Sequence, residues 1–164
     1  MVKNFSKELW KYDVYKPGFN FRLSDLNCAL GISQLKKLDS FIKQRRIIAK
    51  KYNEIFKNNQ NIKIPVELKN VYHSYHLYPL QINFKKIKLN KNIFFKKMLR
   101  EGIKLQVHYI PLYMQPYYKK KYRLKISNFK NSFEFYQKEV SIPIYPGLSS
   151  SQINFITEKI FKLI

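Results

Sequence analysis

Cysteine and acidic residues are scarce in this sequence, and long apolar runs are absent. The only cysteine among the 164 residues is Cys28, which excludes an internal disulfide framework and fits a reducing compartment. No segment approaches the ~20 consecutive apolar residues that a membrane-spanning helix needs. The first ten residues lack the apolar centre of a signal peptide. We therefore expect a cytoplasmic protein with no membrane partner.

The sequence also lacks the common signatures of catalysis and metal binding. Its four glycines form neither a GxGxxG motif nor a P-loop. His73 and His76 would point to opposite faces of a strand, and no further ligand cluster lies nearby. Cys28 is expected to be a small core residue rather than a nucleophile. The residues taken alone therefore predict no catalytic residue and no metal site.

Basic residues, in contrast, are abundant. The chain has 32 Lys and Arg against 10 Asp and Glu, which gives a formal charge of +22. Such an excess is typical of proteins that bind nucleic acid, and residues 117–123 interleave aromatic rings with cations as single-strand binders do. Only five of the basic residues are arginine, the side chain best suited to phosphates and bases. The balance favours a lysine-rich composition, and a nucleic-acid partner remains the less favoured alternative.

The clearest predicted element is a helix. Ser24 is suited to an N-cap, and apolar residues then recur at steps of three and four as far as Phe56. A straight helix of this length would measure ~50 Å, whereas a globule of this size has a radius of gyration of ~15 Å. We therefore expect the helix to break near residues 37–39 or to reach a partner.

The rest of the chain alternates between predicted strands and helices. Strands are expected at residues 74–82, 104–110 and 141–145, and helices at residues 90–99, at 129–140 and after residue 149. Pro79 indicates an edge strand or a bulge, and Ser149 with Gln152 forms a capping box. This order predicts an α+β domain with helices packed on a small sheet. We divide the chain into a joining segment at 1–23, a long and broken helix at 24–58, and an α+β domain at 59–164.

Two segments are suited to binding a ligand. Residues 17–22 form a turn that presents the Asn20 amide and the Arg22 guanidinium just before a helix N-terminus, which suits an anion such as phosphate. Residues 106–111 end a predicted strand with polar and aromatic groups, and loops at strand ends often line ligand sites. The candidate residues of this second segment are Gln106, His108, Tyr109, Ile110 and Pro111. A solvated turn is the alternative for each segment.

The same segments carry a resemblance to a known family. The motifs occur in order at residues 19–26, 29–31, 34–39, 45–49, 73–78, 102–112, 115–118 and 141–149. Together they resemble the C-terminal half of the DegT/StrS-type sugar aminotransferases from about Trp10 onward. Within the family, residues 106–111 and the Gln-Pro-Tyr-Tyr sequence at 115–118 are most similar to the branch that acts in pseudaminic acid biosynthesis.

The resemblance implies a fold, a cofactor and partners. Such proteins are fold-type I homodimers, so it implies a small domain with a mainly antiparallel sheet. They use pyridoxal phosphate to transfer an amino group from glutamate to a 4-keto-6-deoxy UDP-sugar. The resemblance places Asn20 and Arg22 at the cofactor phosphate of the neighbouring subunit. It places Gln106, His108, Tyr109, Ile110 and Pro111 at the nucleotide sugar.

One departure from the family is substantial. Members hold the cofactor covalently on a lysine of an N-terminal large domain, and no lysine of this chain stands in that motif. We therefore expect a C-terminal portion, separated from its large domain by a split, truncated or misread gene and inactive alone. The alternatives are a non-catalytic interaction subunit that docks on a large-domain half, and the basic nucleic-acid binder. Phe19 and Phe21 replace common tyrosines.

Overall fold

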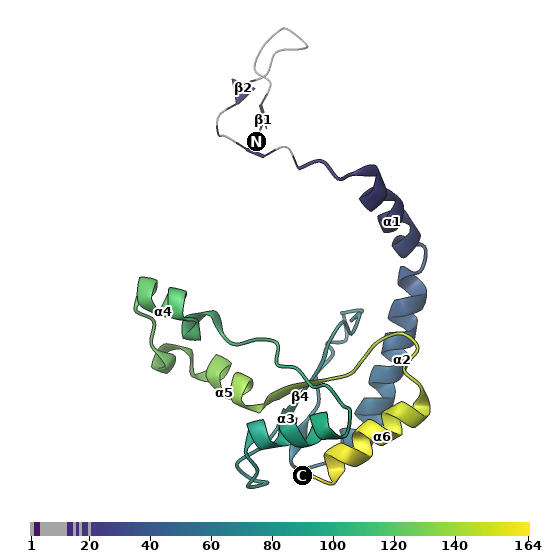
Figure 1. Cartoon of the computed structure of the whole chain (residues 1–164), viewed down its shortest axis with the longest axis vertical. Helices are drawn as coiled ribbons and strands as arrows, with labels where there is room; N and C mark the ends of the chain where they lie inside the picture. The colour runs from purple at the N-terminus through teal and green to yellow at the C-terminus, as the bar shows by residue number, and fades with distance from the viewer. Residues whose placement is uncertain (1, 4–12, 15, 17, 20) are drawn as a thin grey trace. The chain divides into compact units, whose positions relative to one another are not determined.

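The chain divides into two compact units, one ending at Lys37 and one running from Leu38 to Ile164 (Figure 1). A computed structural model describes residues 2–3, 13–14, 16, 18–19 and 21–164. Asn20, one of the two residues expected at a cofactor phosphate, lies outside the described residues.

Among its described residues, the first unit contains two short strands and one helix. Strands β1 (Val2–Lys3) and β2 (Asp13–Val14) pair in antiparallel fashion, and helix α1 spans Asp25–Leu35. The Ser24 hydroxyl accepts a hydrogen bond from the Asn27 amide over 3.4 Å, which confirms the expected N-cap. No residue of α1 is buried, and Cys28 is exposed. The expectation that Cys28 is a core residue was wrong, because no described residue of this unit buries the apolar side of α1.

The second unit holds the remaining elements. Its helices and strands are α2 (Leu38–Phe56), β3 (Ile62–Lys63), β4 (Tyr78–Ile82), α3 (Lys91–Arg100), α4 (Pro116–Tyr122), α5 (Lys130–Lys138), β5 (Glu139–Ile142) and α6 (Ser150–Phe161). Short 3-10 turns lie at Leu112–Met114 and Ile126–Phe129. Between α1 and α2 the helical run is interrupted at Lys36 and Lys37. This α+β composition agrees with the predicted fold class.

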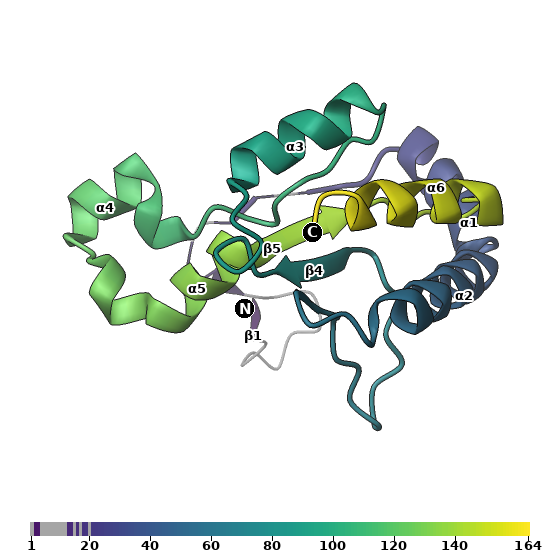
Figure 2. The same ribbon diagram turned by 90° about the horizontal axis from the view of Figure 1, so that it is seen from below.

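A three-stranded antiparallel sheet in the order β3-β4-β5 organises this unit. Leu80 lies opposite Val140 and Tyr78 lies opposite Ile142, so these four side chains share one face of the sheet. That face packs against the helices, and Figure 2 shows α2 and α6 beside each other next to the sheet. The pairs that alternate with these two belong to the opposite face of the sheet. They are Pro79 with Ser141 and Gln81 with Glu139.

The core lies between the first face of the sheet and helices α2, α3 and α6. Its largest fully buried side chains include Tyr52, Phe56, Tyr78, Leu80, Ile82, Phe94, Met98, Ile153 and Ile160. The two buried tyrosines keep hydrogen-bond partners, as buried hydroxyls require. The Tyr52 hydroxyl donates to the Pro143 carbonyl over 2.9 Å, and the Tyr78 hydroxyl donates to Asn53 Oδ1 over 2.5 Å. Burial raises the pKa of both tyrosines.

Pro79 lies in the middle strand, so the expectation of an edge strand was wrong. Its partner Ser141 exchanges both backbone hydrogen bonds with Gln106 on the far side of β5, at 3.2 and 2.9 Å. The Pro79–Ser141 pair therefore requires no donor from Pro79. On the other side of β4, strand β3 pairs only with Gln81 and Ile82. The missing N–H of Pro79 thus faces a position where no strand is paired.

Several predicted boundaries shift, while the predicted caps are confirmed. Asn90 caps α3 by accepting from the Asn92 and Ile93 amides, and the capping box of Ser149 and Gln152 begins α6. The predicted strand at 104–110 is only a single bridge at Gln106. The helix predicted at 129–140 ends at Lys138, and the next strand begins at Glu139 rather than at residue 141.

Candidate functional site

The segment 106–111 leaves the sheet edge beside β5. Gln106 pairs with Ser141, and the chain then turns away, so that Tyr109 is 71% exposed and Ile110 is also exposed. His108 and Pro111 are half-buried. The ring of His108 lies edge-on to that of Tyr109, with their centroids 4.7 Å apart. The segment therefore presents two aromatic groups next to each other at the end of the sheet.

A buried polar network holds His108. Glu139 Oε2 accepts a hydrogen bond from the His108 backbone amide over 3.1 Å, and Glu139 Oε1 accepts one from the Ser141 hydroxyl over 2.6 Å. The Ser141 hydroxyl also lies 2.8 Å from His108 Nδ1. Glu139 is fully buried and Ser141 is nearly so. Both are on the sheet face opposite the helical core, and both contact His108 of the 106–111 segment.

Lys91, at the start of α3, interacts with the charge of Glu139 and lines a neighbouring hollow. Its Nζ donates to the Tyr136 carbonyl over 2.6 Å and lies 5.1 Å from the centroid of the Tyr136 ring. Burial lowers the pKa of Lys91 to about 8, and attraction to Glu139 partly opposes this effect. The hollow has a volume of about 1060 Å³ and is lined by residues that include Lys85, Lys86, Lys91, Val107, Tyr136 and Lys138.

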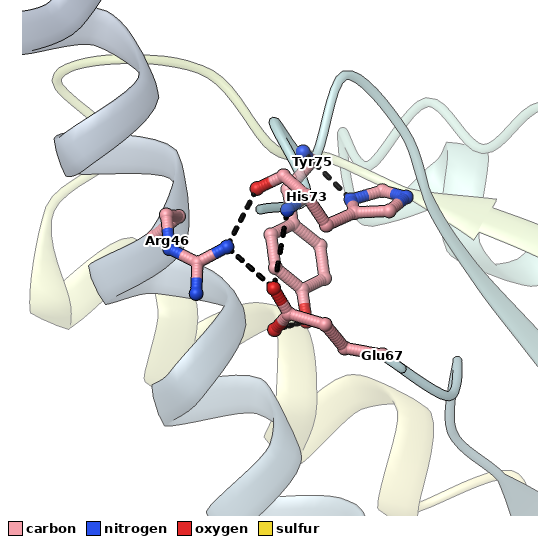
Figure 3. A network of polar contacts seen from close by, with 4 residues as sticks. All are labelled: Arg46, Glu67, His73 and Tyr75. Carbon is pink, nitrogen blue, oxygen red and sulfur yellow. Dashed lines mark hydrogen bonds and ion pairs between the residues drawn. The ribbon is translucent and has the colours of Figure 1, made fainter. Parts of the chain in front are cut away.

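A second polar network fixes the segment before β4 on α2, and Figure 3 shows its four residues. Arg46 donates to Glu67 Oε1 over 2.6 Å and to the His73 carbonyl over 2.8 Å. The His73 amide and the Tyr75 hydroxyl also donate to the Glu67 carboxylate, at 3.1 and 3.0 Å. These hydrogen bonds, the one from Arg46 above all, lower the pKa of Glu67 to about 2.

Arg45 completes this attachment. Its guanidinium donates to the carbonyls of Tyr75, His76 and Ile144, at 3.2, 3.1 and 2.8 Å. It therefore joins the segment before β4 to the one after β5. One turn of α2 thus holds both segments in place.

The histidine pair lies in the segment before β4. Residues 73–76 lie outside a strand, so the expected arrangement on opposite faces does not apply. His73 Nδ1 instead accepts a hydrogen bond from the Tyr75 amide over 2.9 Å. Within the described part of the chain, no group of three metal-ligating side chains is found. Among the same residues, no helix is long and apolar enough to cross a membrane.

The aromatic and basic stretch at 117–123 is mostly helical. It forms α4, and Arg123 ends that helix with a left-handed φ of 50°. Lys121 donates to the Tyr117 hydroxyl over 3.2 Å and lies 5.4 Å from the centroids of the Tyr117 and Tyr122 rings. The Lys121 ammonium therefore contacts aromatic rings of its own helix.

The predicted ligand segments fall in different units of the chain. Arg22 is exposed just before the N-cap of α1, between the exposed Phe21 and Leu23. The residues Gln106, His108, Tyr109, Ile110 and Pro111 all belong to the second unit. Glu139 and Ser141 were missed, because Glu139 was assigned to a helix. Once 139–142 is seen as a strand, their spacing of two places both side chains on one face.

Comparison with known proteins agrees with this fold and these motifs. Residues 1–161 match the model of the DegT/DnrJ/EryC1/StrS aminotransferase family. The UDP-4-amino-4,6-dideoxy-N-acetyl-beta-L-altrosamine transaminase of Campylobacter jejuni is 38% identical over 162 residues, which cover 96% of this chain and 41% of that protein.

Solved structures give the same result. One match is Helicobacter pylori PseC, an aminotransferase involved in the biosynthesis of pseudaminic acid, with a TM-score of 0.81 and 30% sequence identity. The match covers 99% of this chain and 42% of the PseC chain. The PLP form of Spr1654 from Streptococcus pneumoniae matches in fold, with a TM-score of 0.81 and 24% sequence identity. This match covers 94% of this chain and 40% of the Spr1654 chain. The chain thus spans about two fifths of the length of these proteins. The chain belongs to the DegT/DnrJ/EryC1/StrS aminotransferase family.

Proposed function

We propose that the chain is the C-terminal portion of a nucleotide-sugar aminotransferase that depends on pyridoxal phosphate. In this proposal the complete enzyme transfers an amino group from glutamate to a 4-keto-6-deoxy UDP-sugar, for pseudaminic acid and thus for a surface polysaccharide or a flagellin glycan. The observation that carries the proposal is the 38% identity to the Campylobacter jejuni transaminase over 96% of this chain. The 30% identity to PseC supports the same substrate class.

The residues before α1 suit the phosphate end of the cofactor. The Arg22 guanidinium provides a cation with fork geometry, and the N-terminal turn of α1 provides backbone N–H groups beside it. Both kinds of donor favour the binding of a phosphate. Pyridoxal phosphate, when bound, supplies an electron sink for breaking bonds next to the amino nitrogen. We propose that Arg22, together with Asn20, holds the phosphate of a cofactor bound to a neighbouring subunit.

The lysine that anchors the cofactor lies, in this proposal, in a large domain that the 164 residues do not span. The match to only about two fifths of the relatives' length supports the placement of this lysine in another part of the enzyme. The chain would then be inactive alone and would act with a large-domain half or a homodimer partner. Its own contribution is to bind and orient the ligand.

The 106–111 segment is proposed to contact the nucleotide sugar. Tyr109 and Ile110 are exposed, while His108 and Pro111 are half-buried. An exposed aromatic ring can pack on a sugar or a base, and the half-buried imidazole can hydrogen-bond to it. The buried Glu139 holds the His108 backbone, so the segment has a rigid support.

A chimera tests the function. The chain is joined to the N-terminal part of the Campylobacter jejuni relative that the match leaves uncovered, and formation of 2-oxoglutarate from glutamate and the 4-keto UDP-sugar is measured. We expect turnover from the chimera and none from the 164-residue chain alone. Turnover by the chain alone would contradict its proposed role as a portion, and a folded chimera without turnover would contradict the proposed activity.

Variants of the chimera test the cofactor role. R22A should weaken pyridoxal phosphate binding by roughly 10- to 100-fold, because a hydrogen bond to a charged group contributes about 1.5–3 kcal/mol. R100A removes an exposed arginine on α3 and serves as the matched control. Equal cofactor affinity of both variants, followed by cofactor absorbance, would exclude Arg22 from the phosphate site.

A further inference from the structure

We infer that Glu139 and Ser141 are positioning residues that hold neutral His108 with its proton on Nδ1, which leaves Nε2 as a hydrogen-bond acceptor for a donor group of the ligand. The identity of that ligand, a nucleotide sugar with free hydroxyl or amide N–H groups, rests on the proposed function. The tautomer itself rests only on the contacts between the three residues.

The direction of the hydrogen bonds follows from the number of protons available. A carboxylate accepts hydrogen bonds and donates none. Ser141 therefore points its only proton at Glu139 Oε1, 2.6 Å away. The contact of 2.8 Å between the Ser141 hydroxyl and His108 Nδ1 then needs a proton from the ring. Nδ1 must carry that proton, so Nε2 of the neutral ring has a free lone pair.

The donors around Glu139 are those that a carboxylate requires. Its second oxygen accepts the His108 backbone amide over 3.1 Å, so both oxygens are used as acceptors. The Lys91 ammonium interacts favourably with the same carboxylate. A fully buried carboxylate needs such donors and such a charge. The backbone and the ring of His108 are thus fixed by one side chain, directly and through Ser141.

The other ring nitrogen is the group that the network leaves available. In the described part of the chain, the hydrogen bonds of His108 are made by its backbone amide and by Nδ1. The ring lies in the segment that also presents Tyr109. An unprotonated Nε2 can accept from a sugar hydroxyl or an acetamido N–H, and it cannot donate to a carbonyl group. The network thereby selects for a donor on the ligand.

Nitrogen NMR of the 164-residue chain tests the tautomer. The chain has only three histidines, and the spectra are recorded near pH 7.5, about one unit above the ordinary histidine pKa of ~6.5 and below the pKa of Lys91. His73 is an internal reference, because its Nδ1 accepts the Tyr75 amide and its proton is therefore on Nε2. We expect His108 and His73 to show opposite tautomers, with assignments from H108Q and H73Q. A proton on Nε2 of His108 in the unmodified chain would overturn the inference.

An E139Q variant tests the cause. The glutamine must turn its oxygen to the His108 amide, so its NH₂ group donates to Ser141, which then donates to His108 Nδ1. We therefore expect E139Q to move the ring proton from Nδ1 to Nε2, while exposed E158Q leaves it in place. S141A, which removes the bridge, should abolish the fixed preference. An unchanged His73 spectrum shows that each variant is folded, and an unchanged His108 tautomer in folded E139Q or S141A would refute the role of the network.

Activity of the chimera separates the two proposals. If the tautomer is as inferred and E139Q raises the KM for the UDP-sugar by tenfold or more, both the proposed function and the present inference stand. If the tautomer is as inferred but the chimera is inactive on the nucleotide sugar, only the proposed function fails. If the chimera is active and His108 carries its proton on Nε2, only the present inference fails.

Discussion

Arg46 on α2 and Glu67 in the segment before β4 form an ion pair with 2.6 Å between guanidinium nitrogen and carboxylate oxygen. The two residues are 21 positions apart in the chain, so the pair ties the incoming segment to a helix that precedes it. The His73 amide and the Tyr75 hydroxyl add to the same carboxylate. This concentration of donors lowers the pKa of Glu67 to about 2.

The lowered pKa predicts a specific loss of stability in acid. The folded chain binds the Glu67 proton less readily than the unfolded chain, whose glutamate titrates near its ordinary value of 4.5. The stabilising contribution is therefore complete above about pH 4.5 and is lost as the pH falls toward 2. We expect the difference in unfolding free energy between the unmodified chain and E67Q to shrink over this range, as measured by urea unfolding. Y75F, which removes one donor, should show a smaller pH dependence than the unmodified chain. If the difference in unfolding free energy between the unmodified chain and E67Q stays constant from pH 6 to pH 2, the lowered pKa of Glu67 is contradicted.

Lys91 predicts a gain of stability in alkali. Its pKa is lowered to about 8, so between about pH 8 and 10.5 the unfolded chain binds the proton that the folded chain has released. Stability from this group therefore rises with pH over that interval. Between pH 7.5 and pH 10 we expect the unmodified chain to become more stable relative to K91M. The expected gain is about 1 kcal/mol, after a discount for the partial exposure of Lys91. Urea unfolding of both proteins at pH 7.5 and pH 10 measures the change.

Leu80 in the middle strand predicts a large loss of stability on truncation. It is fully buried against the helices, so L80A removes apolar contacts and leaves a cavity that costs about 2–5 kcal/mol. Leu99 on α3 is 62% exposed, and L99A should cost less than about 1 kcal/mol. Chemical denaturation of the two variants compares the same substitution at a buried and an exposed site. Similar losses would contradict the position of the core.

The N-cap of α3 allows a matched test of local structure. The Asn90 side chain accepts from two backbone amides of the first turn, at 2.8 and 3.4 Å, and N90A should cost about 1 kcal/mol of stability. N92A alters the same residue type two positions later, inside the helix and exposed. We expect N92A to be neutral or slightly stabilising, because Ala favours helix interiors. Thermal unfolding of both variants distinguishes the effect of the cap from that of helix propensity.

Local signals in the sequence were sufficient to predict the caps and the fold class. Ser24, Asn90 and Ser149 begin helices where their side chains satisfy nearby amides, and this chemistry involves residues at most three positions apart. The boundary between α5 and β5 was not predictable in this way. Phe135, Val140 and their neighbours fit either period, and only pairing with β4 makes Glu139 the first residue of a strand.

The sequence by itself determined the family motifs, the helix starts and the candidate segments at 17–22 and 106–111. Only the tertiary structure decided which groups support His108, because Glu139 and Ser141 reach it from a strand more than 30 positions later in the chain. It also decided that Pro79 occupies a middle strand, where Gln106 satisfies the backbone of its partner Ser141. Residue type fixes local hydrogen bonding, whereas contacts between distant segments depend on how the sheet and helices pack.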